Sequence, residues 1–144
     1  MSNNFDVQMD KIVADTKEKM FTVVKNSIQE VVQDAQTPVA KGGLMRVDTG
    51  FLRSSGVAAL NEMPSGPTEG RKRLPNETGV LPEYKYDEKN FLIPILSKMK
   101  IGDKFYFGWT AKYATIRELF DGFMEVAIMR WGEIVDEQIR RLKK

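Results

Sequence analysis

Residues 102–118, GDKFYFGWTAKYATIRE, carry the clearest structural pattern in the chain. In the first half of this stretch, every second residue is a large aromatic: Phe105, Phe107 and Trp109. The residues between them are polar, small or tyrosine. A period of two is typical of a strand with one buried face. After this strand the apolar residues recur at helical spacing, at Tyr113, Ile116 and Phe120. We therefore expect the strand to lead directly into a helix, and the rest of the chain to pack against this aromatic corner.

Length and composition indicate one globular domain. The chain has 144 residues, of which 42% are apolar and 29% charged, and its net charge is +2; such a chain can bury a core. It contains neither cysteine nor histidine. This excludes disulfides, thiolate chemistry, the commonest general base and the commonest transition-metal ligand. The start of the chain lacks the pattern of a signal peptide, and no apolar run is long enough to cross a membrane. We expect a soluble protein of the cell interior.

Two long amphipathic helices are expected, one towards each end of the chain. In residues 9–35 apolar side chains recur at steps of three and four, with charges between them and no glycine or proline. Thr37-Pro38 ends this helix, because the residue before a proline resists the helical conformation. Residues 123–142 show the same spacing after a break at Gly122, where Asp121 can serve as the N-cap. The long apolar stripe of the first helix is expected to face the core, and the alternative is that it also extends into a subunit contact.

The middle of the chain is expected to complete a small sheet. Asp48 or Thr49 can cap one helical turn at residues 51–53, and a strand is expected at residues 57–60. A further strand is expected at residues 80–87.

Residues 90–99 fit either a short helix or a buried strand, and we favour the helix. The predicted fold class is α+β, with a long N-terminal helix, a small antiparallel sheet and a C-terminal helix packed across that sheet.

The most polar segment is the loop at residues 61–79, which contains the basic triplet Arg71-Lys72-Arg73. Loops of this length inside a compact domain are commonly functional or flexible. One interpretation is a solvated hairpin tip, and the other is a flexible arm that orders on a partner. The alternative function that follows is a small nucleic-acid-binding module, which would use this basic loop and the basic C-terminus.

No catalytic motif is present in the sequence. Phosphate-binding glycine loops, the metalloprotease helix motif and the nucleophile elbow are all missing. Without histidine or cysteine, an active site would need paired carboxylates or a lysine. The candidate carboxylates are Asp48, Asp103, Glu118, Asp121 and Glu125. Turns, caps and solvated helix faces account for them, so we expect no enzyme activity, no catalytic residue, no metal and no cofactor; a metal-dependent nuclease is the least supported alternative.

Three segments resemble the neck proteins of tailed phages, which are head–tail connector or tail-completion proteins also found in prophages and gene transfer agents. Residues 47–55, VDTGFLRSS, resemble the DTGxLRxS signature of that family. Residues 102–114, GDKFYFGWTAKYA, are similar to its GD–aromatic–GWT–YA block, and Glu118 follows as it does in the family. The C-terminal positions similar to its A…W..IV helix are Ala127, Trp131, Ile134 and Val135.

The resemblance implies a small α+β subunit that works in a closed ring, typically hexameric, in the neck of the virion. Such a ring is assembled in the host cytoplasm. It joins a head-closure or portal-adaptor protein to the tail terminator or tail tube protein, and double-stranded DNA passes through its lumen without sequence-specific binding.

A closed ring of this kind requires two different, complementary faces on each subunit. We expect them on the exposed part of the first helix and on residues 47–60, with the 61–79 loop reaching a neighbouring ring or the lumen. The predicted interface residues are Thr49, Phe51, Leu52, Arg53, Arg71, Lys72 and Arg73. The predicted scaffold corner, which sets the angle between the sheet and the C-terminal helix, consists of Phe105, Phe107, Trp109, Tyr113, Glu118 and Trp131.

Overall fold

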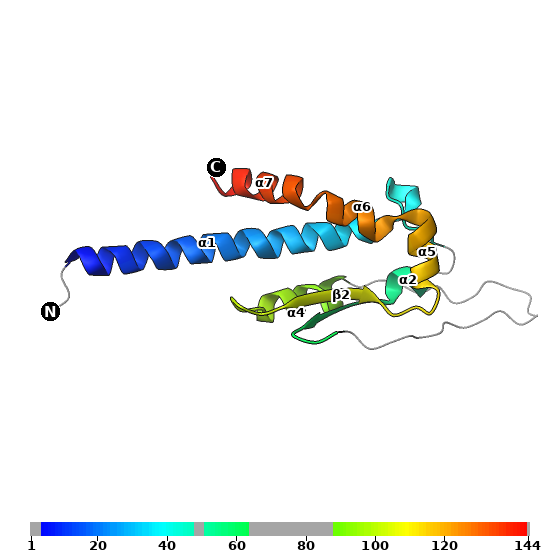
Figure 1. Ribbon diagram of the computed structural model, residues 1–144, viewed down its shortest axis with the longest axis horizontal. Coiled ribbons are helices and arrows are strands. Elements are labelled where there is room, and N and C mark those ends of the chain that lie inside the picture. Colours follow the sequence, from blue (N-terminus) through cyan, green and yellow to red (C-terminus); the bar gives the residue numbers. More distant parts are fainter. Residues whose placement is uncertain (1–3, 48–50, 64–87, 144) are drawn as a thin grey trace, which may run out of the picture.

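A single long helix, α1 (Asn4–Ala35), runs through the molecule between two other layers (Figure 1). The computed structural model describes residues 4–47, 51–63 and 88–143. The C-terminal helices α6 (Phe123–Met129) and α7 (Trp131–Leu142) lie along one side of α1, and the sheet with helix α4 (Ile93–Lys98) lies on the other. The first half of α1 extends beyond both layers.

α1 begins earlier than the sequence pattern indicates. It starts at Asn4 rather than at residue 9, because no glycine or proline in the first turns stops the helix from propagating. It ends at Ala35, as predicted. The chain then turns through Pro38 into a short 3-10 helix (Val39–Lys41).

The sheet consists, within the described residues, of β1 (Gly56–Leu60) and β2 (Phe105–Trp109). The strands are antiparallel, with Ala58 opposite Phe107. A core cluster between the sheet, α1 and α4 contains Val32, Ala58, Leu92 and Leu96, with Phe105 and Phe107 packed against it. The strand predicted at residues 80–87 lies outside the described residues.

The favoured helix at residues 90–99 is confirmed, but it is interrupted. α3 (Glu88–Phe91) and α4 meet at Leu92, whose side chain is fully buried. The predicted turn at residues 51–53 is helix α2 (Phe51–Ser54). Its predicted capping residues, Asp48 and Thr49, lie outside the described residues.

The helix predicted at residues 123–142 is two helices instead of one. The backbone of Arg130 departs from helical geometry (φ −86°, ψ 4°), so α6 ends at Met129 and α7 begins at Trp131. Before them, α5 (Ala114–Asp121) follows β2 closely, as the spacing predicts. Gly122 separates α5 from α6 with a φ of 68°, in the left-handed region where glycine carries no Cβ penalty.

The α+β class is confirmed, with its long N-terminal helix, antiparallel sheet and packed C-terminal helices. The contact between the sheet and the C-terminal helices is made by Phe123, whose ring lies 4.9 Å from that of Trp109 in an edge-to-face arrangement. Beyond Phe123, α6 and α7 follow α1.

Only residues 61–63 of the predicted 61–79 loop are described; the rest, with the basic triplet, lies outside the described residues. Asn61 joins the end of β1 to the turn before β2. Its Oδ1 accepts from the backbone N–H of Lys104 (2.9 Å), and its Nδ2 donates to Asp103 Oδ1 (3.2 Å). The backbone N–H of Lys100 also donates to Asp103 Oδ2 (2.7 Å). The hydrogen bonds from Lys100 and from Asn61 Nδ2 lower the pKa of the Asp103 carboxyl below its usual value.

Candidate assembly surface

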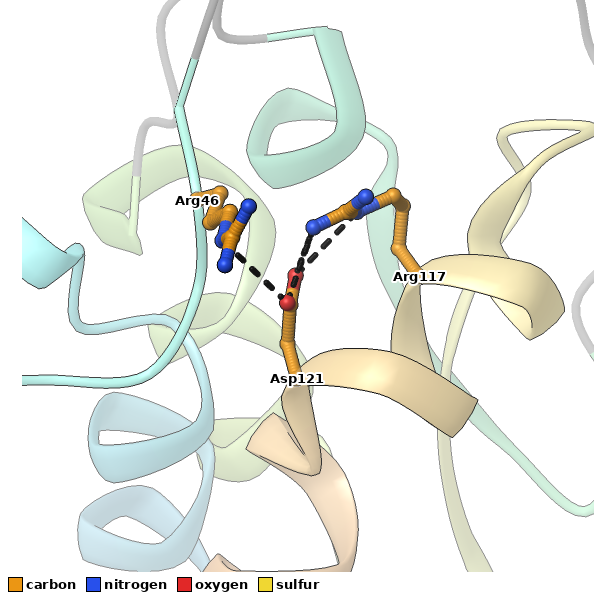
Figure 2. A network of polar contacts seen from close by, with 3 residues as sticks. All are labelled: Arg46, Arg117 and Asp121. Atoms are coloured by element: carbon orange, nitrogen blue, oxygen red, sulfur yellow. Dashed lines mark hydrogen bonds and ion pairs between the residues drawn. The ribbon is translucent and has the colours of Figure 1, made fainter.

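Helix α5 carries its charged residues on the side that faces the protein. Asp121 accepts hydrogen bonds from Arg117 Nε (3.1 Å) and Nη2 (2.8 Å), one turn earlier in α5. Arg46, from the segment after the 3-10 helix, places its Nε 3.4 Å from the same carboxylate. Figure 2 shows both guanidinium groups converging on Asp121. Only 3% of the Asp121 side chain is exposed, and Arg46 links this carboxylate to the segment after the 3-10 helix.

Glu118 fastens α5 to the helix that follows it. Its two carboxylate oxygens accept from the backbone N–H groups of Met124 (2.8 Å) and Glu125 (3.2 Å), in the first turn of α6. These are N–H groups that lack partners inside a helix, and a negative charge there is favoured by the helix dipole. The prediction that Asp121 caps this helix is therefore wrong. Glu118 performs that role because Arg117 and Arg46 already occupy the Asp121 carboxylate.

The opposite side of α5 is apolar and faces solvent. Leu119 is 80% exposed, Phe120 78% and Ile116 57%; we call these three residues the α5 face. Their spacing of three and four places them on one side of the helix. An ordinary surface helix turns its apolar stripe towards the core and its charges towards water. α5 has the reverse arrangement, which makes this apolar surface a candidate interaction site.

A second exposed apolar row lies on the first half of α1. Residues 4–20 are all exposed, and the row of apolar side chains on them consists of Phe5, Met9, Ile12, Val13 and Met20, which we call the α1 seam. Continued at the same steps, the row reaches Val23 and Ser27, which are buried. The exposed and buried halves therefore belong to one stripe.

The same side of α1 faces α7 over its second half. Asp34 forms an ion pair with Arg130 at the start of α7 (2.6 Å), and Gln138 donates to Glu30 (2.9 Å). Burial raises the pKa of Asp34, while the charge of Arg130 opposes that shift. A groove between the two helices is lined mainly by polar side chains, with Val23 and Leu142 as its apolar members. α7 ends at Leu142, and the first half of α1 continues beyond it (Figure 1).

The predicted scaffold residues on β2 lie where the sheet meets the helices. Phe105 and Phe107 pack against the cluster between the sheet, α1 and α4. Trp109 packs against a second cluster formed by Met45, Leu52, Ala111 and Phe123. Its ring lies 5.2 Å from that of Phe107, so the aromatic side chains connect the two clusters.

The other two aromatic residues of the predicted corner lie at its margins. Tyr113 precedes α5, and its ring lies 6.3 Å from that of Phe51. Trp131 is not in either cluster; it begins α7 and is 40% exposed. The break at Arg130 explains the difference, because it starts a new helix at Trp131 instead of continuing the buried side of α6.

Gln36 joins three segments of this region through its side-chain amide and its backbone carbonyl. Its Oε1 accepts from Trp109 Nε1 (2.7 Å), and its Nε2 donates to the carbonyl of Arg53 (2.9 Å). Arg53 Nε donates in return to the carbonyl of Gln36 (2.8 Å). A Cβ at position 56 would lie 2.6 Å from Gln36 Nε2, so Gly56 leaves room for this network. A glutamine after an amphipathic helix carries no sequence signal of such a role.

The predicted interface residues on α2 are mostly engaged within the chain. Leu52, a predicted interface residue, is buried within the chain in the cluster that contains Met45 and Phe123. The helix turn at residues 51–54 has to bury one apolar residue, and Leu52 is on that side. Phe51 is half-buried, and Arg53 is held by Gln36. Thr49, Arg71, Lys72 and Arg73 lie outside the described residues.

The basic C-terminus of the alternative hypothesis is partly paired. Arg140 Nη1 lies 3.6 Å from Glu137 Oε2, and Arg141 Nε lies 3.4 Å from Glu137 Oε1. In residues 4–47, 51–63 and 88–143, no group of three or more acidic residues is placed to hold a metal ion. None of the helices in this part of the chain is both long and apolar enough to cross a membrane.

We compared the chain with known protein families, curated proteins and solved structures. No protein-family model matches the chain, and neither a curated protein nor a solved structure matches it.

Proposed function

We propose that this chain is a structural subunit of a phage particle, a neck protein that forms a ring between the head and the tail. The observation that carries the proposal is the inverted helix α5. Its Asp121 is nearly buried and pairs with Arg46 and Arg117, while Ile116, Leu119 and Phe120 face outward. An exposed apolar surface on a rigid base is what an assembling subunit offers to its neighbour.

The class of assembly comes from the resemblance of residues 47–55 and 102–114 to neck proteins. In this proposal the subunits form a homo-oligomeric ring, a hexamer by analogy with that family. A head-closure or portal-adaptor protein lies on one side of the ring, and a tail terminator or tail tube protein lies on the other. Double-stranded DNA passes through the lumen, and the ring resides in the neck of the virion after assembly in the host cytoplasm.

The proposal is tested by removing the chain from the phage. Particles made without it should contain filled heads and free tails that do not join, as seen in electron micrographs, and infectivity should be lost. Supplying the wild-type chain in trans should restore joined particles. Fully assembled, infectious particles without the chain contradict the proposal.

A matched pair of variants connects the test to the surface. Phe120→Ser changes the α5 face and should fail to restore joining. Thr115→Ser, an exposed substitution on the same helix, should restore it fully. If both variants restore joining equally, the α5 face is not the assembly surface.

A further inference from the structure

From the two exposed apolar surfaces, we infer that the α1 seam of one copy docks on the α5 face of the next copy. This inference rests on the proposed function, because it assumes that copies of the chain associate. It deepens that proposal by assigning the two faces of the subunit contact. The residues are Phe5, Met9, Ile12, Val13 and Met20 on one copy, and Ile116, Leu119 and Phe120 on its neighbour.

The positions of the two surfaces favour a head-to-tail contact. The exposed half of α1 projects from one end of the molecule, and α5 lies at the opposite end (Figure 1). A two-fold contact uses the same patch on both subunits, whereas a ring requires two different patches that fit each other. Two unlike apolar patches at opposite ends meet the requirement for a ring, and each copy then covers one surface and has the other covered.

The α1 seam is continuous with a surface that already receives a helix. Over its second half, the same row of side chains lies under α7, which contributes the buried residues Ile134 and Gln138. The row continues at unchanged spacing for about 23 Å from residue 20 back to residue 5, at 1.5 Å per residue. α5 presents its apolar residues at matching steps of three and four. The α5 helix of a neighbouring copy can therefore pack on the α1 seam beyond the end of α7, in the way that α7 packs on the second half of α1.

The charges beside the seam favour a protein partner over a lipid surface. Residues 4–22 of α1 contain four acidic and three basic side chains, namely Asp6, Asp10, Asp15, Glu18, Lys11, Lys17 and Lys19. An amphipathic helix that binds anionic lipids is rich in lysine and arginine on its polar side. A mixed charge pattern of this kind is typical of a helix that packs in a protein assembly.

The absence of cysteine from the natural sequence makes the contact directly testable. We would prepare two single-cysteine variants, Met9→Cys on the seam and Leu119→Cys on the α5 face, and treat them with a flexible bismaleimide. Both positions are exposed, so neither substitution disturbs the core. An equal mixture should give heterodimers, and the double variant should give a ladder of cross-linked oligomers. Each single variant alone should stay monomeric on a denaturing gel.

A control on α1 separates a specific contact from random collision. Glu18→Cys lies on the side of the helix opposite Met9, by the helical spacing. Mixed with Leu119→Cys, it should give a cross-linking yield several-fold lower than that of the Met9→Cys mixture. Equal yields overturn the inference. So do dimers from Met9→Cys alone, which indicate paired seams, and dimers from Leu119→Cys alone, which indicate paired α5 faces.

The same variants, incorporated into particles, distinguish failure of this inference from failure of the proposed function. If particles need the chain for joining but show no link between positions 9 and 119, either in particles or in concentrated solution, the contact is wrong and the function stands. If particles join without the chain while the purified chain still links 9 to 119, the neck function is wrong and the contact stands.

Discussion

Phe120 and Phe123 are three residues apart, yet their side chains have opposite environments. Phe123 is 2% exposed and packs edge-to-face on Trp109, while Phe120 is 78% exposed on the α5 face. The left-handed turn at Gly122 lies between them and redirects the chain. Apolar side chains therefore have two uses in this molecule. Those of the α6 start stabilise the fold, and those of α5 are available for association.

The largest effect on stability is expected at the buried residue of this pair. Phe123→Ala leaves a cavity between Trp109 and Leu52 and should lower the free energy of unfolding by about 3–5 kcal/mol. The matched control is Phe120→Ala, which should change it by less than about 0.5 kcal/mol. Urea unfolding at low protein concentration, where association does not contribute, measures both values. Similar losses for the two variants would remove the distinction between the two environments.

The second largest effect is expected at the base of α5. Asp121→Asn keeps the shape of the side chain but removes the negative charge that Arg117 and Arg46 share. The expected loss is about 1–3 kcal/mol in the free energy of unfolding, since a nearly buried charged hydrogen-bond acceptor is removed. Asp136→Asn, at an exposed position on α7, is the control and should be neutral. A neutral Asp121→Asn would show that the network does not hold α5 in place.

A smaller effect is expected where α5 is fastened to α6. Glu118→Ala removes the acceptor for two backbone N–H groups, and loss of a helix cap of this kind costs about 0.5–2 kcal/mol. Glu118→Gln retains one accepting oxygen and should lose less. Thermal unfolding followed by circular dichroism compares the two variants. If Gln is as damaging as Ala, the charge and not the hydrogen bonds provides the stabilisation.

The smallest effect on stability, and the largest on association, is expected on the α5 face. Phe120→Ser should leave the free energy of unfolding within about 0.5 kcal/mol of the wild type. Sedimentation at increasing concentration should nevertheless show weaker self-association, because the exposed ring no longer contributes buried apolar area. A variant that loses stability but associates normally would reverse the roles that we assign to Phe120 and Phe123.

The local signals in the sequence were sufficient for most elements of the fold. The alternation at Phe105, Phe107 and Trp109 predicts β2, and the change of period after Ala111 predicts α5, because these periods follow from backbone geometry alone. The long run without glycine or proline predicts α1, although its start at Asn4 precedes the first clear periodic residue. The break at Arg130 was not predicted, since the side chains on either side of it keep a helical spacing.

The candidate surface was harder to predict from the sequence than the helices and strands. An apolar stripe shows which residues share a side of a helix, but it does not show which side faces the core. For α5 the apolar side faces out, while Asp121 on the opposite side is nearly buried and pairs with Arg46, a residue distant in sequence. Leu52 was predicted to lie in an interface because the motif at residues 47–55 does not show which residues Leu52 packs against.

Residue types and their spacing along the chain therefore predict α1, β2 and α5, the absence of thiol and imidazole chemistry, and the aromatic composition of the corner. These depend on residue type and on spacing along the chain. The packing of the folded chain sets three further features: Gln36 joins Trp109 to Arg53, Glu118 and not Asp121 caps α6, and Phe120 faces outward while Phe123 faces inward. Each of these depends on which distant groups compete for the same partner, and that competition exists only in the folded chain.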